Sequence, residues 1–165
     1  MIRNLTLVTA LLAAPMAYAD SDGPSGDPVA GEAAFRSCIA CHVVRNDEGE
    51  VLAGRNGRSG PNLYGLPGRA AGSVEGFRYS PAMIAGAEAG LVWDEETFVE
   101  YVPNATEFLR EFSGQGGVRS SMSPQRASEE DIANIWALLV SLSPMMMMED
   151  GDMMDEDMME EEDSE

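Results

Sequence analysis

The amino-acid sequence predicts an all-α domain with few helices and long loops. The clearest helical pattern lies near the end of the chain, where apolar residues recur at i, i+3, i+4 and i+7 spacing, at Ile132, Ile135, Trp136 and Leu139. No stretch alternates apolar and polar residues for long enough to indicate a long strand. The loops are rich in Gly, Pro and Asn, so the helices alone offer little core. The domain therefore needs a large apolar group at its centre.

The two ends of the chain differ in composition from the middle. Residues 1–19 are typical of an export signal, with Arg3, an apolar run over 5–14 and the cleavage motif Ala17-Tyr18-Ala19. Because the apolar run is shorter than the roughly 20 residues of a bilayer span, we expect cleavage after Ala19 and no remaining membrane span. A bacterial periplasm is the expected destination. Residues 145–165 contain only Met, Asp, Glu, Gly and Ser, which predicts a disordered acidic tail. Residues 20–144 are expected to form one domain.

Three helices are predicted in this domain. The first has Asp27 as its N-cap, Pro28 in its first turn, and runs to the cysteines. Gly31 in this helix allows another helix to approach closely, unless it is a plain surface glycine. The second helix opens at Asp94 and ends near residues 103–104; one face carries Phe98, Tyr101 and Val102. The third begins with a capping-box-like sequence over 128–131 and stops at residues 143–144.

The segments between these helices carry turn formers. Residues 43–60 predict an extended surface loop, since they are rich in Gly, Asn and Arg with few apolar anchors. Residues 60–68 alternate turn formers with apolar residues, as expected for irregular chain against a flat object. Residues 86–90 indicate a further break.

The motif Cys38-Ile39-Ala40-Cys41-His42 carries the chemistry. This pattern is typical of c-type haem attachment, in which both sulfurs bond to the porphyrin and the imidazole binds iron. The chain has two cysteines and one histidine, whereas a structural zinc site needs about four such ligands. A redox disulfide and chance spacing are the remaining alternatives, and no βαβ pattern of the kind that a redox disulfide favours surrounds the motif. We therefore expect one covalent haem c, with its iron, per chain.

The second iron ligand is predicted to be a methionine, because no second histidine exists. Two methionines lie in the signal segment and eight in the acidic tail, which leaves Met83 and Met122. Met122 follows a Gly-rich stretch that could cross to the opposite haem face, whereas Met83 closely follows Pro81 and is typical of core. We predict His42 and Met122 as the iron ligands. Met83, a tail methionine and an open coordination site are the alternatives.

With these motifs, residues from about Gly31 to Leu142 resemble the class I cytochromes c, in particular the long periplasmic cytochrome c2 subgroup. The resemblance implies a cytochrome c fold wrapped around the haem. In the segment Gly60-Pro61-Asn62-Leu63 it implies that the Pro61 carbonyl contacts the His42 imidazole. It also implies that the haem propionates are held by Arg69, Tyr79 and Trp93, that Tyr101 touches the methionine sulfur, and that Gly31 and Phe35 pack near Ile135 and Leu138.

Residue type alone leaves simpler roles open for these side chains. Arg69 could be a solvated cation, and Tyr79, Trp93 and Tyr101 could be ordinary core residues. The chain also contains no lysine. Any positive ring around an exposed haem edge must therefore come from arginines, with candidates at Arg45, Arg55, Arg58, Arg119 and Arg126.

The resemblance implies a soluble, monomeric electron carrier rather than an enzyme. Iron bound by His42 and Met122 has no open site, so peroxidase-like chemistry requires displacement of the methionine. The implied donor is a cytochrome bc1 complex, and the implied acceptor is a terminal oxidase or a photosynthetic reaction centre. These contacts are expected to be transient, and no nucleic acid is expected as a partner. The tail methionines would also suit Cu(I), as an alternative to a solubilising role.

Overall fold

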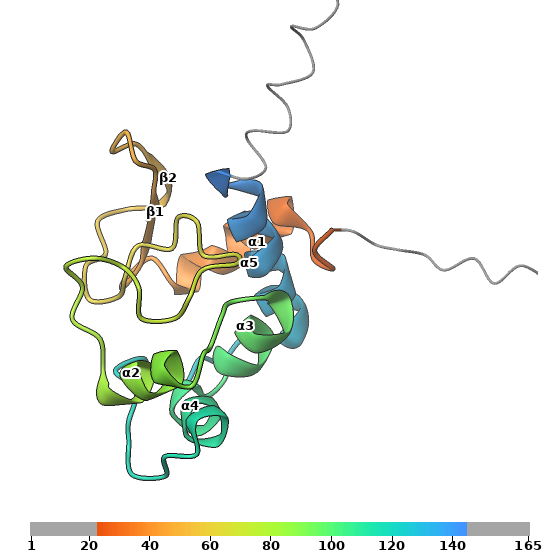
Figure 1. Cartoon of the computed structure of the whole chain (residues 1–165). Coiled ribbons are helices and arrows are strands. Elements are labelled where there is room, and N and C mark those ends of the chain that lie inside the picture. The colour runs from red at the N-terminus through yellow and green to blue at the C-terminus, as the bar shows by residue number, and fades with distance from the viewer. Residues whose placement is uncertain (1–22, 145–165) are drawn as a thin grey trace, which may run out of the picture.

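The computed structural model describes residues 23–144, which fold into helices joined by long loops and one short hairpin (Figure 1). The elements in chain order are α1 (Pro28–Ala34), η1 (Phe35–Ser37), β1 (Val43–Arg45), β2 (Val51–Gly54), α2 (Pro81–Glu88), α3 (Glu95–Tyr101), α4 (Ala105–Ser113) and α5 (Glu129–Ser141). The predicted export signal and acidic tail lie outside the described residues. Among residues 23–144, no helix has the length and apolar character that crossing a membrane requires.

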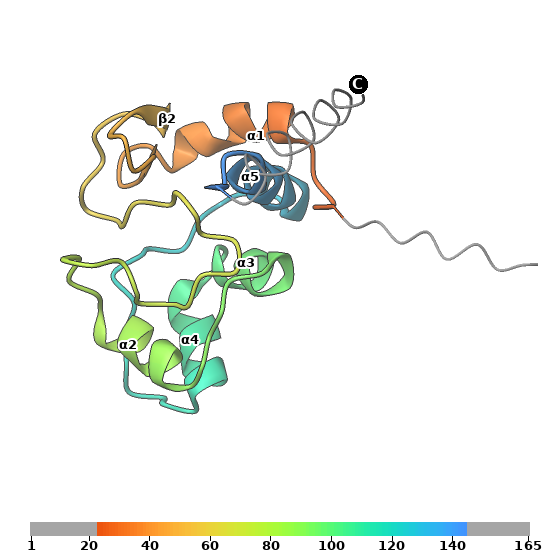
Figure 2. The ribbon, with the colours of Figure 1, turned by 45° about the horizontal axis from the view of Figure 1, so that its top comes forward.

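The terminal helices α1 and α5 pack against each other at one side of the molecule (Figure 2). Gly31 makes this approach possible, because a Cβ built there would lie 2.1 Å from the backbone oxygen of Asn134 and 2.9 Å from Cβ of Leu138. Phe35 is 2% exposed and belongs to the same core cluster as Ile135 and Leu138. The expected packing of the first helix on the last is thereby confirmed.

The predicted helix starts are also present. Asp27 caps α1, with its carboxylate accepting from the backbone amides of Val29 and Ala30. Asp94 and Thr97 form a reciprocal capping box at α3. Ser128 caps α5 by accepting from the Asp131 amide at 3.1 Å. The expected apolar faces are buried in both α3 and α5.

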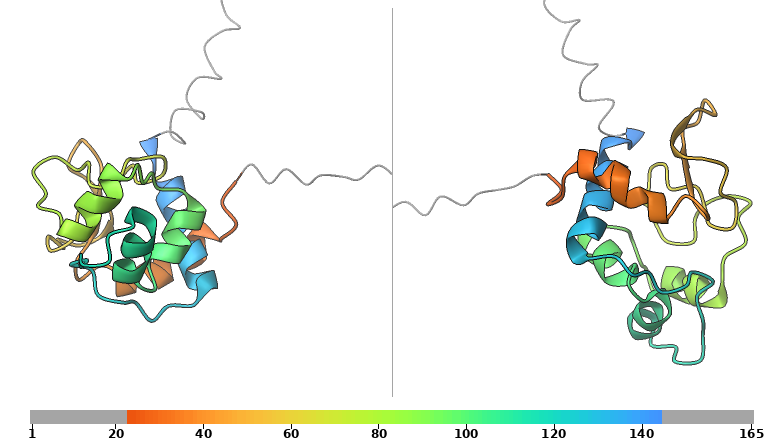
Figure 3. Two further views of the ribbon diagram at one scale, coloured as in Figure 1. Left: turned by 60° about the horizontal axis from the view of Figure 1, so that its bottom comes forward. Right: turned by 180° about the vertical axis from the view of Figure 1, so that it is seen from behind.

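Helices α2 and α4 lie on the other side of the molecule, with α3 between them and the α1–α5 pair (Figures 2 and 3). Phe98 of α3 contacts Trp136 of α5, with ring centroids 5.4 Å apart. Neither α2 nor α4 was expected from the sequence. The break predicted over residues 86–90 is wrong in its first part, because Gly86 lies inside α2, where a Cβ would meet Cδ2 of Leu109 in α4 at 2.8 Å. The chain reverses only at Gly90, whose φ is 87°.

Residues 43–60 are not the surface loop that the sequence predicts. Strand β1 pairs antiparallel with β2, and Val44 is fully buried. Leu63 also donates its amide to the Val43 carbonyl at 2.9 Å, so the following loop is tied to the hairpin. Composition suggested exposure because the flanking residues are polar. The short strands are anchored instead by two adjacent valines.

Candidate haem site

A cavity of about 350 Å³ lies among the loops and helices, and every site residue predicted from the sequence lines it. These residues are Cys38, Cys41, His42, Pro61, Arg69, Tyr79, Trp93, Tyr101 and Met122. They come from the turn after η1, the long loop before α2, the segment just before α3, the end of α3 and the segment before α5. Apolar walls complete the cavity, among them Leu63, Leu66, Phe98 and Ile135.

A tight turn after η1 directs the motif residues into the cavity. The amides of Cys41 and His42 both donate to the Cys38 carbonyl, at 3.1 and 2.9 Å. Residues three and four apart in such a turn share one face. The two thiols are free, with Cys38 half-buried and Cys41 exposed. Burial raises the pKa of the Cys38 thiol, the Ser37 hydroxyl opposes this effect, and Cys41 adds to it.

The His42 imidazole is held by backbone groups. Its Nδ1 lies 3.0 Å from the Pro61 carbonyl oxygen, and because a carbonyl only accepts, Nδ1 carries the proton. Nε2 therefore keeps its lone pair. Burial lowers the pKa of His42, although the Pro61 contact opposes this, so the neutral ring is favoured. A Cβ built on Gly60 would lie only 2.3 Å from Cε1 of the ring, so the imidazole rests directly on the backbone.

Asn62 holds the Gly60–Pro61 segment against β1. Its side-chain amide donates to the Arg45 carbonyl at 2.7 Å and accepts from the Arg45 amide at 3.0 Å. On the other side, the Gly60 amide donates to the Cys41 carbonyl at 2.8 Å. Gly60 and Asn62 flank Pro61 but were not predicted as site residues. The only sequence signal for them was their place in the Gly-Pro-Asn motif.

Arg69 and Trp93 are neighbours because their segments pair. Trp93 donates its amide to the Arg69 carbonyl at 3.0 Å and accepts from the Gly68 amide at 2.8 Å. The Arg69 guanidinium donates to the carbonyls of Tyr64 and Asn62 at 2.8 and 3.0 Å. Burial lowers the pKa of Arg69 and Tyr79 opposes this. The guanidinium is thus a half-buried, fixed donor at the cavity wall.

Tyr79 and Tyr101 contribute hydroxyls to the cavity. The Tyr79 hydroxyl accepts from the Val74 amide at 3.1 Å. Tyr101 packs edge-on against Trp93 with centroids 4.9 Å apart. Burial raises the pKa of Tyr101 to about 12, with the Ser120 side chain opposing the shift. The Tyr101 hydroxyl therefore stays protonated at neutral pH.

Met122 reaches the cavity on a segment that α4 anchors. The Arg110 Nε donates to the Val118 carbonyl at 2.7 Å, and the Ser120 amide donates to the Thr106 hydroxyl at 3.1 Å. The Met122 amide in turn donates to the Ser120 hydroxyl at 3.1 Å. Met83 also lines the cavity, but it sits inside α2 and is 8% exposed.

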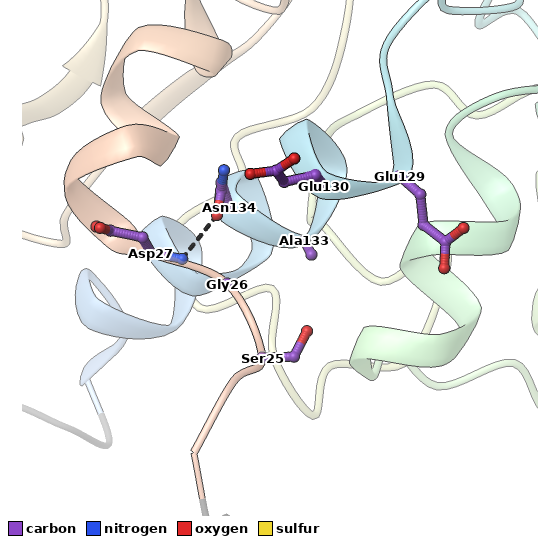
Figure 4. A pocket seen from close by; sticks show the side chains of 7 residues that line it. All are labelled: Ser25, Gly26, Asp27, Glu129, Glu130, Ala133 and Asn134. Carbon is purple, nitrogen blue, oxygen red and sulfur yellow. Dashed lines mark hydrogen bonds between the residues drawn. The ribbon is translucent and has the colours of Figure 1, made fainter.

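A second depression, of about 550 Å³, lies between the start of α1 and the start of α5 (Figure 4). Its lining residues are Ser25, Gly26, Asp27, Glu129, Glu130, Ala133 and Asn134. The Asn134 amide oxygen is already used, since it accepts from the Asp27 backbone amide at 2.7 Å. No group of three or more His, Cys, Asp or Glu side chains suited to a metal ion occurs within residues 23–144. This depression has none of the predicted site residues.

The residues of the first cavity fit a covalent haem. Two thiols and an imidazole converge from one turn, and thioethers line the same cavity. The walls combine apolar side chains with a fixed guanidinium, an indole and phenols, which suits a flat apolar ring with acidic groups.

The chain is similar to several bacterial cytochromes. It is 53% identical over 118 residues to cytochrome c2 of Rhodovulum adriaticum, covering 72% of this chain and 94% of that protein. It is 36% identical over 121 residues to cytochrome c-550 of Paracoccus versutus, covering 72% of this chain and 77% of that protein. The crystal structure of cytochrome c2 from Rhodobacter sphaeroides superposes with a TM-score of 0.70 at 44% identity, covering 72% of this chain and 97% of that one. A scan against models of known protein families finds no match.

These relatives are electron-transfer proteins with covalent haem c, and the two attachment cysteines are present in this chain. The sequence identity to these relatives, over about 72% of this chain, is higher than unrelated proteins with the same fold would share. The chain belongs to the cytochrome c2 and c-550 family, and is a haem c electron carrier rather than an enzyme.

Proposed function

We propose that this protein shuttles single electrons in the bacterial periplasm from a cytochrome bc1 complex to a terminal oxidase or a photosynthetic reaction centre. The observation that carries the proposal is the convergence of all nine predicted site residues on one cavity. When bound, the haem supplies one-electron Fe(III)/Fe(II) chemistry. Export with cleavage after Ala19 would deliver the chain to that compartment.

The thiols of Cys38 and Cys41 are the proposed covalent anchors, and His42 is the proposed ligand on the same side. Because the Pro61 carbonyl accepts from Nδ1, it keeps the imidazole in one tautomer and one orientation with Nε2 free. Such a contact increases the basicity of a metal-bound imidazole. Gly60 supports this arrangement, since any larger residue would collide with the ring.

Met122 is the proposed second ligand. It lies on a loop rather than in a helix, and α4 fixes that loop through Val118 and Ser120. A thioether and an imidazole that both bound the iron would leave no coordination site for substrate and would raise the reduction potential relative to histidine alone. Tyr101 is proposed to donate its hydroxyl proton toward the sulfur. Its raised pKa, about 12, keeps that proton in place.

Arg69, Tyr79 and Trp93 are proposed to hold the propionates. All three line the cavity, and backbone pairing fixes Arg69 and Trp93 beside each other. Burying a carboxylate is costly unless donors meet it. A half-buried guanidinium, an indole N–H and a phenol are donors of that kind.

The carrier role is tested with the haem-loaded mature protein and purified bc1 complex. We expect rapid reduction by the complex, followed by reoxidation on addition of an oxidase or reaction centre. The rates should vary with ionic strength, since charged surfaces steer such encounters. Reduction no faster than by a non-physiological reductant, with no response to any of these complexes, would refute these partners.

A further inference from the structure

The segment that carries Met122 has few contacts with the rest of the domain. Residues 116–127, which we call the methionine loop, lie between α4 and α5 and contain no helix or strand. Most of these residues are exposed, and within this described stretch the side chains that pack partly against the hydrophobic core are Val118, Met122 and Ala127. Segments with few buried apolar contacts and an exposed backbone open more readily than the rest of a fold.

Two side chains of α4 hold the backbone of the methionine loop. Within residues 23–144, this backbone makes two hydrogen bonds to helices or strands, and both go to α4. The Val118 carbonyl accepts from Nε of Arg110 at 2.7 Å, and the Ser120 amide donates to the Thr106 hydroxyl at 3.1 Å. Because Thr106 and Arg110 are four residues apart, they share one face of the helix. The loop is therefore held along a single face of α4.

The hydrogen bond to Thr106 is linked to Met122 through Ser120. The Ser120 hydroxyl accepts from the Met122 amide at 3.1 Å. The Ser120 side chain also opposes the rise in the pKa of Tyr101 that burial causes. Release of Ser120 from α4 would therefore disturb both Met122 and the hydroxyl proposed to face its sulfur.

Helix α4 is fixed in the core, whereas the loop leaves it through glycines. Ala105 and Leu109, which precede Thr106 and Arg110 in sequence, are both fully buried. The chain then passes through Gly114, whose φ is 69°, and through Gly116 and Gly117, where a built Cβ would meet nothing within 4 Å. Glycine leaves the backbone its greatest freedom. The loop can therefore swing at this end while α4 stays in place.

We propose that Thr106 and Arg110 are positioning residues for Met122. Their two hydrogen bonds form a latch between α4 and the methionine loop, and the opening rate of this latch sets the rate at which the Met122 sulfur leaves its place in the cavity. No residue of α4 lines the cavity, so this control acts from outside the site. The latch is a property of the two hydrogen bonds alone; that its opening uncovers the iron rests on the proposed function.

Amide hydrogen exchange in the haem-loaded mature protein measures the latch itself. Each variant is measured at the hydrogen bond that it leaves intact. Arg110→Leu removes a charged donor, and exchange of the Ser120 amide, which is bonded to Thr106, should become about ten-fold faster. Thr106→Val keeps the volume but lacks the hydroxyl, and exchange of the Met122 amide should become about five-fold faster. Such coupling is expected only if the two hydrogen bonds open together.

Imidazole binding measures the consequence for the iron. With excess imidazole and ferric protein, the observed binding rate stops rising with imidazole concentration once departure of Met122 is limiting. The plateau rate then equals the rate of that departure. We expect this plateau to rise about ten-fold in Arg110→Leu and about five-fold in Thr106→Val.

Matched variants separate the latch from charge and from general stability. Thr106→Ser keeps the accepting hydroxyl, and Arg110→Gln keeps an N–H bonded to Cδ, where the arginine has Nε; both should restore most of the wild-type exchange and plateau rates. Arg55→Gln removes the same charge at an exposed position and should change neither rate. Gly31→Ala weakens the α1–α5 contact, and it should lower the guanidinium midpoint without changing either rate.

Each outcome decides between the latch and the iron ligand. If exchange at Ser120 and Met122 is unchanged in Arg110→Leu and Thr106→Val, or rises as much in Gly31→Ala, the latch proposal is wrong. If exchange rises while the imidazole plateau stays at the wild-type value, the latch does not control Met122, and the proposal is also wrong. If exchange rises but imidazole binds wild-type protein without any plateau, the latch exists and Met122 is not the iron ligand.

Discussion

The imidazole of His42 has almost no freedom, because backbone atoms contact it on two sides. Pro61 accepts from Nδ1 at 3.0 Å, and the Gly60 backbone lies against the ring. The Pro61 segment is itself fixed by the side-chain amide of Asn62, which bonds to the backbone of Arg45 in β1. The orientation of His42, the proposed iron ligand, thus depends on neighbouring residues that are not themselves proposed to bind iron.

Gly60→Ala is expected to disturb this site. A Cβ would lie 2.3–2.7 Å from three ring atoms, so either the imidazole or the loop must move. Overpacking of this kind costs about 1–3 kcal/mol, and we expect a lower guanidinium midpoint, a lower yield of haem-loaded protein and a shifted reduction potential. In Gly117→Ala, where nothing lies within 4 Å of the new atom, all three should stay at the wild-type values. Equal behaviour of the two variants would contradict this account.

Tyr101 is expected to make stability fall at alkaline pH. Burial raises its pKa from 10.0 to about 12, so between these values the unfolded chain releases a proton that the folded chain keeps. The favourable contribution is therefore complete below pH 10 and is lost as pH rises toward 12. A shift of two units corresponds to about 3 kcal/mol. In denaturant titrations Tyr101→Phe should lose less stability than wild type over this range; an identical loss would assign the effect to another group.

For single residues, the sequence predicted the haem-binding side chains better than the residues that hold those side chains in place. The two cysteines and the single histidine form one motif, so their grouping required no knowledge of the fold. Gly60 and Asn62 act through the exact path of the backbone, which a residue type cannot show. That Arg69 and Trp93 are adjacent follows from pairing across 23 intervening residues, and only the folded chain reveals it.

Among the elements, the α1–α5 crossing depends on the absence of a side chain at Gly31. Gly31→Ala would put Cβ 2.1 Å from a backbone oxygen of α5. Backbone cannot rotate away, so the helices must separate, and we expect a loss at the upper end of the 1–3 kcal/mol range. Glu32→Ala, at an exposed position of the same helix, should change stability by less than about 0.5 kcal/mol.

Gly86→Ala in α2 should be milder than Gly31→Ala. Its new atom would meet Cδ2 of Leu109 at 2.8 Å and Cδ2 of Leu91 at an ordinary contact distance of 3.5 Å, and the end of a leucine side chain can shift. Alanine also gains about 1 kcal/mol of helix propensity over glycine, which offsets part of the clash. Denaturant midpoints of the two variants test this order, and an equal or larger loss for Gly86→Ala would contradict it.

The helices that the sequence predicted are those with strong local signals. Asp27-Pro28, Asp94 and Ser128 are good caps, and α5 has a regular apolar face. Helices α2 and α4 were missed for physical reasons. Gly86 resembled a break, although a close helix contact needs it. Asn104 follows Pro103 and resembled a helix end, although its side chain caps α4 by accepting from the Glu107 amide.

Over the whole molecule, the haem cavity interrupts the apolar core. It measures about 350 Å³, and its walls include Leu63, Leu66 and Phe98. A haem bound there would shield these side chains from water, at roughly 25 cal/mol per Å² of apolar surface, so the fold depends on its occupant. The sequence indicated this dependence through its few helices and long loops, whereas the volume came from the structure.

The mature chain without haem is therefore expected to lack a cooperative transition. Replacing both Cys38 and Cys41 with serine prevents covalent attachment while leaving the helices unchanged. Thermal unfolding followed by circular dichroism should show a shallow, non-cooperative curve for this variant and a sharp one for the haem protein. A sharp transition in the variant would mean that the polypeptide supplies its own core.

Ligation of the haem iron by His42 and Met122 is tested most directly by the spectra of two variants of the haem-loaded protein. Met122→Ala should lose the weak sulfur-to-iron band of the ferric form and bind carbon monoxide when reduced. Met83→Leu, which removes the other thioether of the cavity, should keep the band and exclude carbon monoxide. Retention of the band in Met122→Ala, or its loss in Met83→Leu, would contradict the assignment.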